Sequence, residues 1–205
     1  MNLRKLSIIT GLSYFIIFFA AIFANFFAIE ALMKNPLETI QQNHLLVRFG
    51  ILAFLVTVVF DVVVAWALYL LYKSNYLSSL STLFRMMHAA IMGVAIFALP
   101  LTFKVSTSND ILNHVHTFNT IWLIGLFFFG IHLILLGRII NTPKFITLFV
   151  ILAGVMYMID TCAHFLLPDY DAYSSIFLAL VAIPSIIGEM SLAIWLLLKG
   201  FKNNA

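Results

Sequence analysis

Charged side chains are scarce in this sequence. Only 9% of its 205 residues are Asp, Glu, Lys or Arg, and 63% are hydrophobic, whereas soluble domains carry about 25% charged residues. A chain of this size could not bury so much apolar side chain in water, because much of any folded surface faces the solvent. The mean hydropathy of +1.10 therefore excludes a soluble globular domain and indicates that the chain folds in a lipid bilayer.

Cysteine and clustered basic residues are also lacking. Cys162 is the single cysteine, which excludes an internal disulfide and any metal cluster built on several cysteines. The net charge of +3 comes without a basic run or zinc-knuckle spacing, so no nucleic-acid partner is expected. The G-x-S-x-G, H-E-x-x-H, P-loop and Rossmann glycine patterns do not occur, and the chemistry of soluble enzymes is not indicated.

Long apolar runs take up most of the chain. A membrane-spanning helix needs about 20 mostly apolar residues, and six segments meet that requirement. They are 6–29, 48–72, 79–103, 115–140, 144–167 and 173–199. None of them alternates with period two, which excludes a barrel, and no loop is long enough to fold alone. We predict an all-α integral membrane bundle of six transmembrane helices, a single domain over residues 1–205.

The distribution of basic residues predicts the orientation of these spans. Lysine and arginine concentrate on short cytoplasmic loops. With the N-terminus inside, the cytoplasmic side holds seven basic residues and the outer side three. The seven are Arg4, Lys5, Lys73, Arg138, Lys144, Lys199 and Lys202, and the three are Lys34, Arg48 and Lys104. We therefore predict that both termini are cytoplasmic and that the protein lies in the inner membrane.

Ionisable residues inside the spans are the candidate functional residues. A charge at mid-membrane costs about 2.5–3.5 kcal/mol on insertion scales, so such side chains are expected to face the bundle interior and to find partners. An inner group at similar depth consists of Asp61, Arg85, His88, His132 and Glu189. This intramembrane polar network is predicted to serve in binding or in proton relay.

A second group is predicted nearer the outer ends of the helices. Arg48 stands at the mouth of the second span, and Asp160 and His164 are four residues apart on one face of the fifth. These three residues are predicted to form an outer vestibule. Three further histidines in or near the outer loops are expected to be ordinary loop residues: His44, His114 and His116.

The charges inside the spans do not balance. Three carboxylates (Asp61, Asp160 and Glu189) face two arginines (Arg48 and Arg85) if histidine is neutral. One carboxylate then lacks a fixed cation, and either it takes up a proton or a histidine gains one to meet it. We predict that Asp61 is this carboxylate because it lies deepest. A group that exchanges a proton inside a helical bundle is what a proton relay requires.

Metal or haem chemistry is a competing interpretation. Asp160 and His164 have the i, i+4 spacing of two metal ligands on one helix, and His116 is a candidate third ligand. His88 and His132 lie at similar depth on consecutive spans and could hold a haem between them. No spacing signature identifies a cofactor, so the cofactor stays unknown.

Several sequence strings resemble one known family. They are RFGI (48–51), FDV (60–62), ALYLLY (67–72), FRMMHAAIMG (84–93), FFGIHLILLG (128–137), the segment 153–170, and IGEMSLAIW (187–195). Over nearly the whole chain they resemble the bacterial membrane family called domain of unknown function 4386. The resemblance implies a multi-pass membrane fold, but no activity, substrate or cofactor. It places six residues at the family's polar positions: Arg48, Asp61, Arg85, His132, Asp160 and Glu189.

The resemblance also bears on His88. The family more often has an amide at this position, which argues against a haem ligand or a catalytic base there.

Three functions remain open from the sequence. The first is a transporter-like protein for a small molecule or an ion coupled to protons, and six short-looped helices are few for this, which suits a homo-oligomer. The second is a membrane-embedded metal- or haem-dependent enzyme. The third is a structural or accessory protein in which pairs such as Arg48 with Asp160 only fix helix packing.

Overall fold

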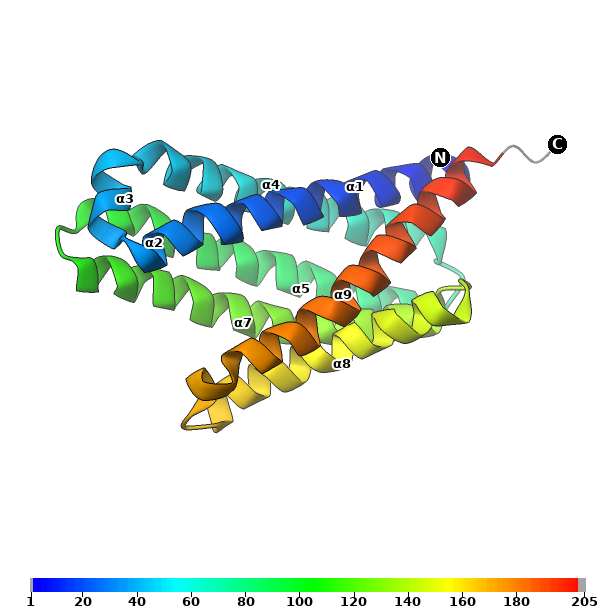
Figure 1. Cartoon of the computed structure of the whole chain (residues 1–205). Helices are drawn as coiled ribbons and strands as arrows, with labels where there is room; N and C mark the ends of the chain where they lie inside the picture. Colours follow the sequence, from blue (N-terminus) through cyan, green and yellow to red (C-terminus); the bar gives the residue numbers. More distant parts are fainter. Residues whose placement is uncertain (1, 203–205) are drawn as a thin grey trace.

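The computed structural model describes residues 2–202, which are almost entirely helical (Figure 1). Six helical segments are long and apolar enough to cross a bilayer: Leu3–Lys34, His44–Leu71, Ser78–Lys104, Ser108–Ile139, Lys144–Leu166 and Tyr170–Phe201. No strand occurs between residues 2 and 202. The prediction of an all-α bundle with six spans is confirmed. Several helices run a few residues beyond the predicted ranges, because helical hydrogen bonding continues past the apolar stretch that marks each span.

The elements keep a simple chain order. They are α1 (Leu3–Phe23), a π-helical turn (Ala24–Ile29), α2 (Glu30–Lys34), α3 (Pro36–Gln42), α4 (His44–Leu71), α5 (Ser78–Ile96), α6 (Ala98–Leu101), a 3-10 turn (Thr102–Lys104), α7 (Ser108–Ile139), α8 (Lys144–Leu166) and α9 (Tyr170–Phe201). Local sequence explains several of the boundaries. Pro36 begins α3, where its missing N–H costs nothing. Thr107 caps α7 by accepting a hydrogen bond from the Asp110 backbone at 3.2 Å.

The six spans form a ring in chain order. Helix α1 packs against α4, α4 against α5, α5 against α7, α7 against α8, and α8 against α9, and α9 closes the ring by packing against α1 (Figure 1). The beginning of α1 and the end of α9 meet, since Arg4 Nε donates a hydrogen bond to the Gly200 carbonyl at 3.2 Å. We call this end of the bundle the terminus side and the other end the far side.

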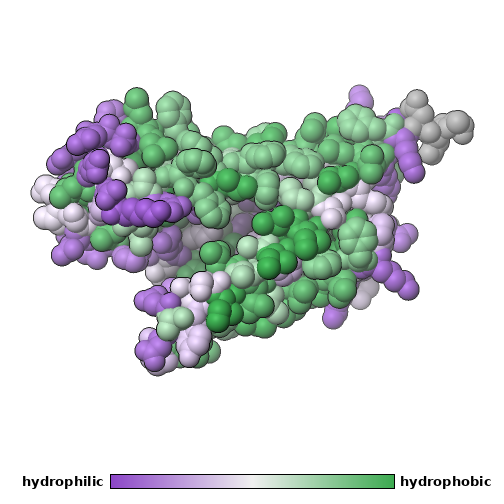
Figure 2. All heavy atoms as spheres, viewed as in Figure 1, coloured by the Kyte–Doolittle hydropathy of each residue, from purple (hydrophilic) through white to green (hydrophobic). Residues whose placement is uncertain are grey.

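The surface is divided as a bilayer requires. Figure 2 shows a hydrophobic belt between two hydrophilic ends. Large apolar side chains point outward along this belt, for example Leu83, Val94 and Leu148, each more than 60% exposed. In water such a surface would aggregate, whereas in lipid it is the expected exterior. The protein is therefore a multi-pass membrane protein.

Two apolar cores fill the bundle at different depths. The terminus-side core draws buried residues from α1, α4, α7, α8 and α9, and includes Leu68, Leu136 and Leu192. The far-side core draws on the first span, α4, α5, α6 and α7, and includes Phe54 and Phe118. Within residues 2–202, helices α8 and α9 supply no buried side chain to the far-side core. Five spans, including α8 and α9, therefore build the terminus-side core, and four spans build the far-side core without them.

Helices α8 and α9 stand away from the other spans on the far side. Their connecting end lies apart from α1 and α7 in Figure 1, and α9 crosses the bundle obliquely from there to the terminus side. In residues 171–180 of α9, every side chain is exposed except Phe177, which is partly buried. Figure 2 shows the surface hollowed between α1 and this pair of helices. The six apolar segments of the sequence did not predict this hollow.

Candidate functional site

Arg85 on α5 is the centre of a buried network. Its side chain is 1% exposed, and its Nη2 donates to Asp61 Oδ1 on α4 at 2.6 Å. Its Nη1 donates to the Tyr14 hydroxyl on α1 at 2.9 Å and to Nε2 of His132 on α7 at 3.2 Å. One guanidinium thus joins four spans through charge-assisted bonds, the strong kind in a low-dielectric interior.

These bonds fix the protonation of His132. A guanidinium only donates hydrogen bonds, so Nε2 of His132 accepts from Arg85 and carries no proton. The proton is on Nδ1, which donates to the Ser81 carbonyl at 2.9 Å. The Ser81 hydroxyl lies 2.9 Å from the same nitrogen. His132 is therefore a neutral imidazole that orients Arg85, an assignment that follows from the hydrogen-bond network.

His88 meets the other side of Asp61. Its Nδ1 donates to the Gly125 carbonyl of α7 at 2.9 Å, since a carbonyl only accepts. Its Nε2 lies 3.6 Å from Asp61 Oδ2. Two unprotonated atoms at this distance would repel each other. The contact is attractive when a proton lies on Nε2 or on Oδ2, so the His88–Asp61 pair is a place where the network can hold an additional proton.

Glu189 on α9 is the network's second carboxylate. It is partly exposed, and no side chain in residues 2–202 forms an ion pair or hydrogen bond with it. It still interacts electrostatically with Arg85, Tyr14 and Tyr157. Its neighbour Gly188 packs on the α8 backbone, where a Cβ atom would lie 2.8 Å from the Val150 nitrogen. Helix α9 therefore approaches α8 closely at the level of Glu189.

The prediction that Asp61 is the carboxylate without a fixed cation was wrong. Asp61 is 4% exposed and pairs directly with Arg85, which comes from the neighbouring antiparallel helix. Within residues 2–202, Glu189 is left without a cation, and so is Asp160, which has only the Tyr170 hydroxyl as a partner. Depth along a helix did not decide the pairing. Rotation about the helix axis did, because it turns Asp61 and Arg85 toward each other.

The structure brings the inner group together as a set. Asp61, Arg85, His88 and His132 are in direct contact, and Glu189 faces them from α9. The sequence analysis missed Tyr14, because it took only charged residues and histidines inside the spans as candidates. The signal was present, since Tyr14 lies in the middle of the first apolar run rather than at its end.

The outer group is not assembled as predicted. The Arg48 guanidinium is exposed and lies over the Phe103 ring at 4.8 Å from its centroid. Asp160 accepts a hydrogen bond from the Tyr170 hydroxyl at 2.7 Å, and the His164 ring packs edge-on against Tyr170. The predicted pairing of Arg48 with Asp160 was therefore wrong. Helices α4 and α8 are not neighbours in the ring, and α8 stands away from α4 on the far side.

The structure also tests the metal and haem interpretations. No three His, Cys, Asp or Glu side chains in residues 2–202 are grouped to hold a metal ion, so His116 does not join Asp160 and His164. Both ring nitrogens of His132 have protein partners, as does Nδ1 of His88. The Phe129 ring packs against both imidazoles, at centroid distances of 4.7 Å and 5.8 Å. The residues present do not fit a haem between these two histidines.

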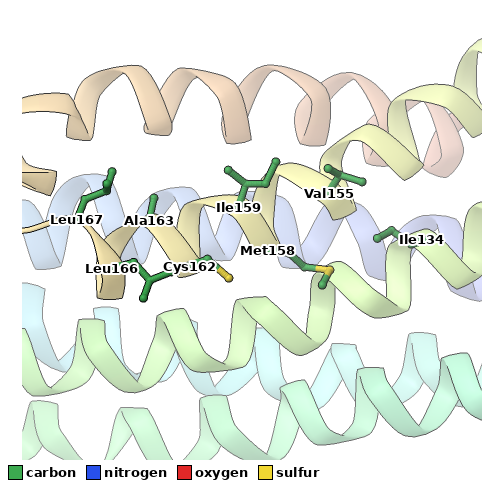
Figure 3. Close-up of a pocket in the computed structure, with 8 residues that line it drawn as sticks. All are labelled: Ile134, Val155, Met158, Ile159, Cys162, Ala163, Leu166 and Leu167. Atoms are coloured by element: carbon green, nitrogen blue, oxygen red, sulfur yellow. The ribbon is translucent and has the colours of Figure 1, made fainter.

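A groove elsewhere on the protein is lined by apolar side chains and one cysteine and carries no Asp, Glu, His, Lys or Arg. It has a volume of about 560 Å³ and runs between α7 and α8 on the outside of the bundle. Figure 3 shows it lined by apolar side chains, with Met158 and Cys162 supplying the sulfur atoms. A similar groove of about 510 Å³ lies between α8 and α9. Both are surfaces for lipid tails, and the polar network remains the candidate site.

The contribution of Tyr14 to the network can be measured. We expect Tyr14→Phe to lower the free energy of unfolding by about 1–3 kcal/mol, because Arg85 Nη1 loses an acceptor in a buried site. Thermal unfolding of the detergent-solubilised protein measures this effect. The matched control is Tyr69→Phe, which removes a hydroxyl from an exposed ring on α4. Equal melting temperatures for the two variants would show that the Tyr14–Arg85 bond contributes nothing.

The class of protein follows from this geometry: six apolar helices enclose a network of ionisable side chains inside a membrane protein. The chain belongs to the family described as Domain of unknown function (DUF4386), whose model matches residues 9–200. It is also similar to an uncharacterized protein of Archaeoglobus fulgidus, with 29% identity over 160 residues that cover 75% of this chain and 85% of the relative. The family resemblance is thus confirmed, although an archaeal relative does not indicate a bacterial source. No solved structure matches the chain.

Proposed function

We propose that this protein is a proton-coupled transporter-like protein of the inner membrane, with both termini in the cytoplasm. The carrying observation is the enclosed network in which Asp61 pairs with Arg85 while Glu189 has no fixed cation. The excess of lysine and arginine on the side of the termini supports this orientation, because cytoplasmic loops are rich in basic residues. The family carries no assigned activity, so the proposal depends on the chemistry of the network.

The proposal follows from a count of charges. Ionised Asp61, Arg85 and Glu189 carry a net charge of −1 when both histidines are neutral, since two carboxylates face one guanidinium. One proton restores neutrality, either on Glu189 or in the contact between His88 and Asp61. Charge left uncompensated in a low-dielectric interior is costly. The network is therefore expected to hold one proton, and moving it between these two places leaves the total charge unchanged.

The surroundings of the network support transport. Beyond it, toward the terminus side, lies an apolar core that includes Leu68, Leu136 and Leu192. Toward the far side lies the hollow beside α9. Of the network, Glu189 alone is partly exposed, and it lies on the helix that borders this hollow. This is the arrangement that a transport site with access from one side would have.

Two interruptions in the spans support the same proposal. Pro184 lies inside α9 and removes the hydrogen bond that the Leu180 carbonyl would receive in a regular helix. The first span contains the π-helical turn at Ala24–Ile29. Neither span is broken, since both stay helical throughout. Each has a point at which the regular hydrogen-bond pattern is interrupted and the helix can bend, and bending of helices is one way in which parts of a transporter move against each other.

The test is proton uptake by liposomes that contain the purified protein. We expect uptake driven by a pH gradient in the wild type and at least about a tenfold reduction in Glu189→Gln, since an amide cannot exchange a proton. The matched control is Glu38→Gln, which changes an exposed glutamate of α3. A well-folded Glu189→Gln variant with wild-type uptake would contradict the proposal.

An accessory role is the second candidate. The observation that favours it is that Arg85 bonds to three other spans, which is what a packing residue does. Under this alternative, wild-type liposomes take up protons no faster than liposomes without protein. The same experiment therefore separates the two functions.

A further inference from the structure

The helical stripe that leads to Glu189 is open on the far side. Residues three or four apart share one face of a helix, so Ser174, Leu178, Val181 and Ser185 lie on the face of Glu189. Ser174 is exposed and Leu178 is 62% exposed, Val181 is partly exposed, and Ser185 is 8% exposed. Exposure thus falls from Ser174 to Ser185, and Glu189 beyond them is partly exposed. Helix α9 borders the hollow in Figure 2, and Glu189 lies on the same face of this helix closer to the network.

Glu189 has an aromatic neighbour on α8. Tyr157 on α8 lies close enough to interact with both Glu189 and Ser185. Its ring meets the Phe129 ring edge-on, with 5.5 Å between centroids. Aromatic faces attract cations, and the attraction is stronger away from water. A carboxylate beside such rings is complementary to a cation.

The net charge selects the sign of the ligand. Arg85 is already compensated by Asp61 at 2.6 Å, so ionised Glu189 leaves the site with one negative charge. An anion would add a second. A small metal cation needs several oxygen ligands, and residues 2–202 contain no group of carboxylate and histidine side chains that could hold one. An organic cation needs only the one carboxylate, because its own apolar surface is solvated by the hydrophobic walls.

We propose that the hollow between α9 and α1 binds lipophilic organic cations, which pair with Glu189 in exchange for its proton. The proposal rests on the proposed proton-coupled function and names its substrate class. The exchange balances: the Glu189 carboxyl releases one proton to the solvent, and the cation takes its place as the counter-charge. The hollow opens sideways at membrane depth, so the cation reaches it from the lipid.

Other titratable or charged groups lie around Glu189, and a pH experiment has to distinguish their protons from the proton of Glu189. They are Tyr14 on α1, Tyr157 on α8, Arg85 on α5 and Asp61 on α4. His88 lies behind Asp61. Tyrosine and arginine ordinarily keep their protons between pH 6 and pH 8, so the contact between His88 and Asp61 is the competing source of a released proton. His88→Gln tests it, because glutamine keeps a donor but does not titrate.

The experiment is equilibrium dialysis of tetraphenylphosphonium against the detergent-solubilised full chain. We expect binding at pH 8, binding that is at least about tenfold weaker at pH 6, and close to one proton released per cation bound at pH 6, where the carboxyl group holds its proton. Glu189→Gln is expected to weaken binding at pH 8 at least about tenfold. Glu38→Gln is the matched control and is expected to bind as the wild type does. His88→Gln is expected to retain the pH dependence.

Three results would overturn the proposal. The first is tetraphenylphosphonium binding that is equal in Glu189→Gln and in the wild type, or independent of pH. The second is loss of the pH dependence in His88→Gln, which would assign the proton to His88. The third is a disulfide-linked dimer of Leu178→Cys in a Cys162→Ser background, formed in membranes, which would show that a second copy covers the hollow.

The outcome also distinguishes this inference from the proposed function. If wild-type liposomes take up protons in a Glu189-dependent way but the protein binds no tetraphenylphosphonium, proton coupling stands and the substrate class is wrong. If the cation binds through Glu189 but no proton uptake occurs, the binding site stands and transport is wrong.

Discussion

Arg85→Met is expected to prevent stable folding, and a second substitution, Asp61→Leu, is expected to restore most of the loss. Arg85 and Asp61 are 1% and 4% exposed, and their side chains are 2.6 Å apart. Removing one partner of a buried pair leaves the other charge uncompensated, at a cost of about 3–5 kcal/mol. Folded proteins are stable by only about 5–15 kcal/mol in total. The single variant is therefore expected to lose most of its stability.

The double variant separates charge from packing. With methionine and leucine in place of the pair, no charge is stranded, and apolar replacement of a buried ion pair is often neutral or stabilising. Tyr14 and His132 still lose their bonds to Arg85, so recovery is expected to be large but incomplete. Yield of monodisperse protein and its melting temperature in detergent measure both effects.

Glu189→Gln is the matched control for this cycle. It removes a carboxylate that has no ion-pair partner in the described chain, so its melting temperature is expected to match or exceed that of the wild type. A single Arg85→Met variant that melts with the wild type would contradict the argument. It would show that Asp61 takes up a proton at little cost when its partner is gone.

The spans were predictable because lipid allows few solutions. A backbone in hydrocarbon has to satisfy its own hydrogen bonds, so an apolar run of about 20 residues is helical. The same physics predicted that Asp61, Arg85, His88 and His132 meet in the interior. The sequence does not reveal the rotation of each helix. For that reason it did not show that Arg85 pairs with Asp61 while Glu189 stays without a cation.

The prediction of the outer group was wrong for a different reason. Arg48 and Asp160 were paired by depth alone, but the order of helices around the ring separates α4 from α8. Hydropathy also gave no sign of the hollow beside α9. An apolar side chain in residues 171–180 suits contact with lipid as well as contact with a neighbouring helix, so hydropathy does not tell the two apart. The orientation of the termini and the choice of membrane stay predictions, since a bundle has the same internal contacts in either direction.

Gly130→Ala is the second substitution expected to have a large effect, because it separates α7 from α8. A Cβ atom at Gly130 would lie 2.5 Å from the Gly154 carbonyl oxygen, and one at Gly154 would lie 2.5 Å from the Gly130 carbonyl oxygen. Both obstacles are backbone atoms, which cannot rotate away as a flexible side chain does. The two helices have to move apart, and close approach through small residues is a main source of helix association in lipid.

The control for this prediction is another glycine in the same membrane region. A Cβ atom at Gly93 on α5 meets no atom within 4 Å, and alanine favours a helix more than glycine does. Gly93→Ala is expected to leave the melting temperature unchanged or slightly raised. Gly130→Ala is expected to lower stability by about 3 kcal/mol, the upper end of the usual cost of overpacking. Equal melting temperatures would show that α7 and α8 do not need this contact.

Gly130→Ala is also expected to change the geometry of the polar network. Gly130 lies between Phe129, which packs on both imidazoles, and His132, which orients Arg85. On the other side of the contact, α8 carries Tyr157 toward Glu189. Moving α7 from α8 therefore shifts the rings next to Glu189 relative to the Asp61–Arg85 pair. A Gly130→Ala protein that still folds is expected to take up protons more slowly than Gly93→Ala in liposomes, because the carboxylate and the pair are no longer held at one distance.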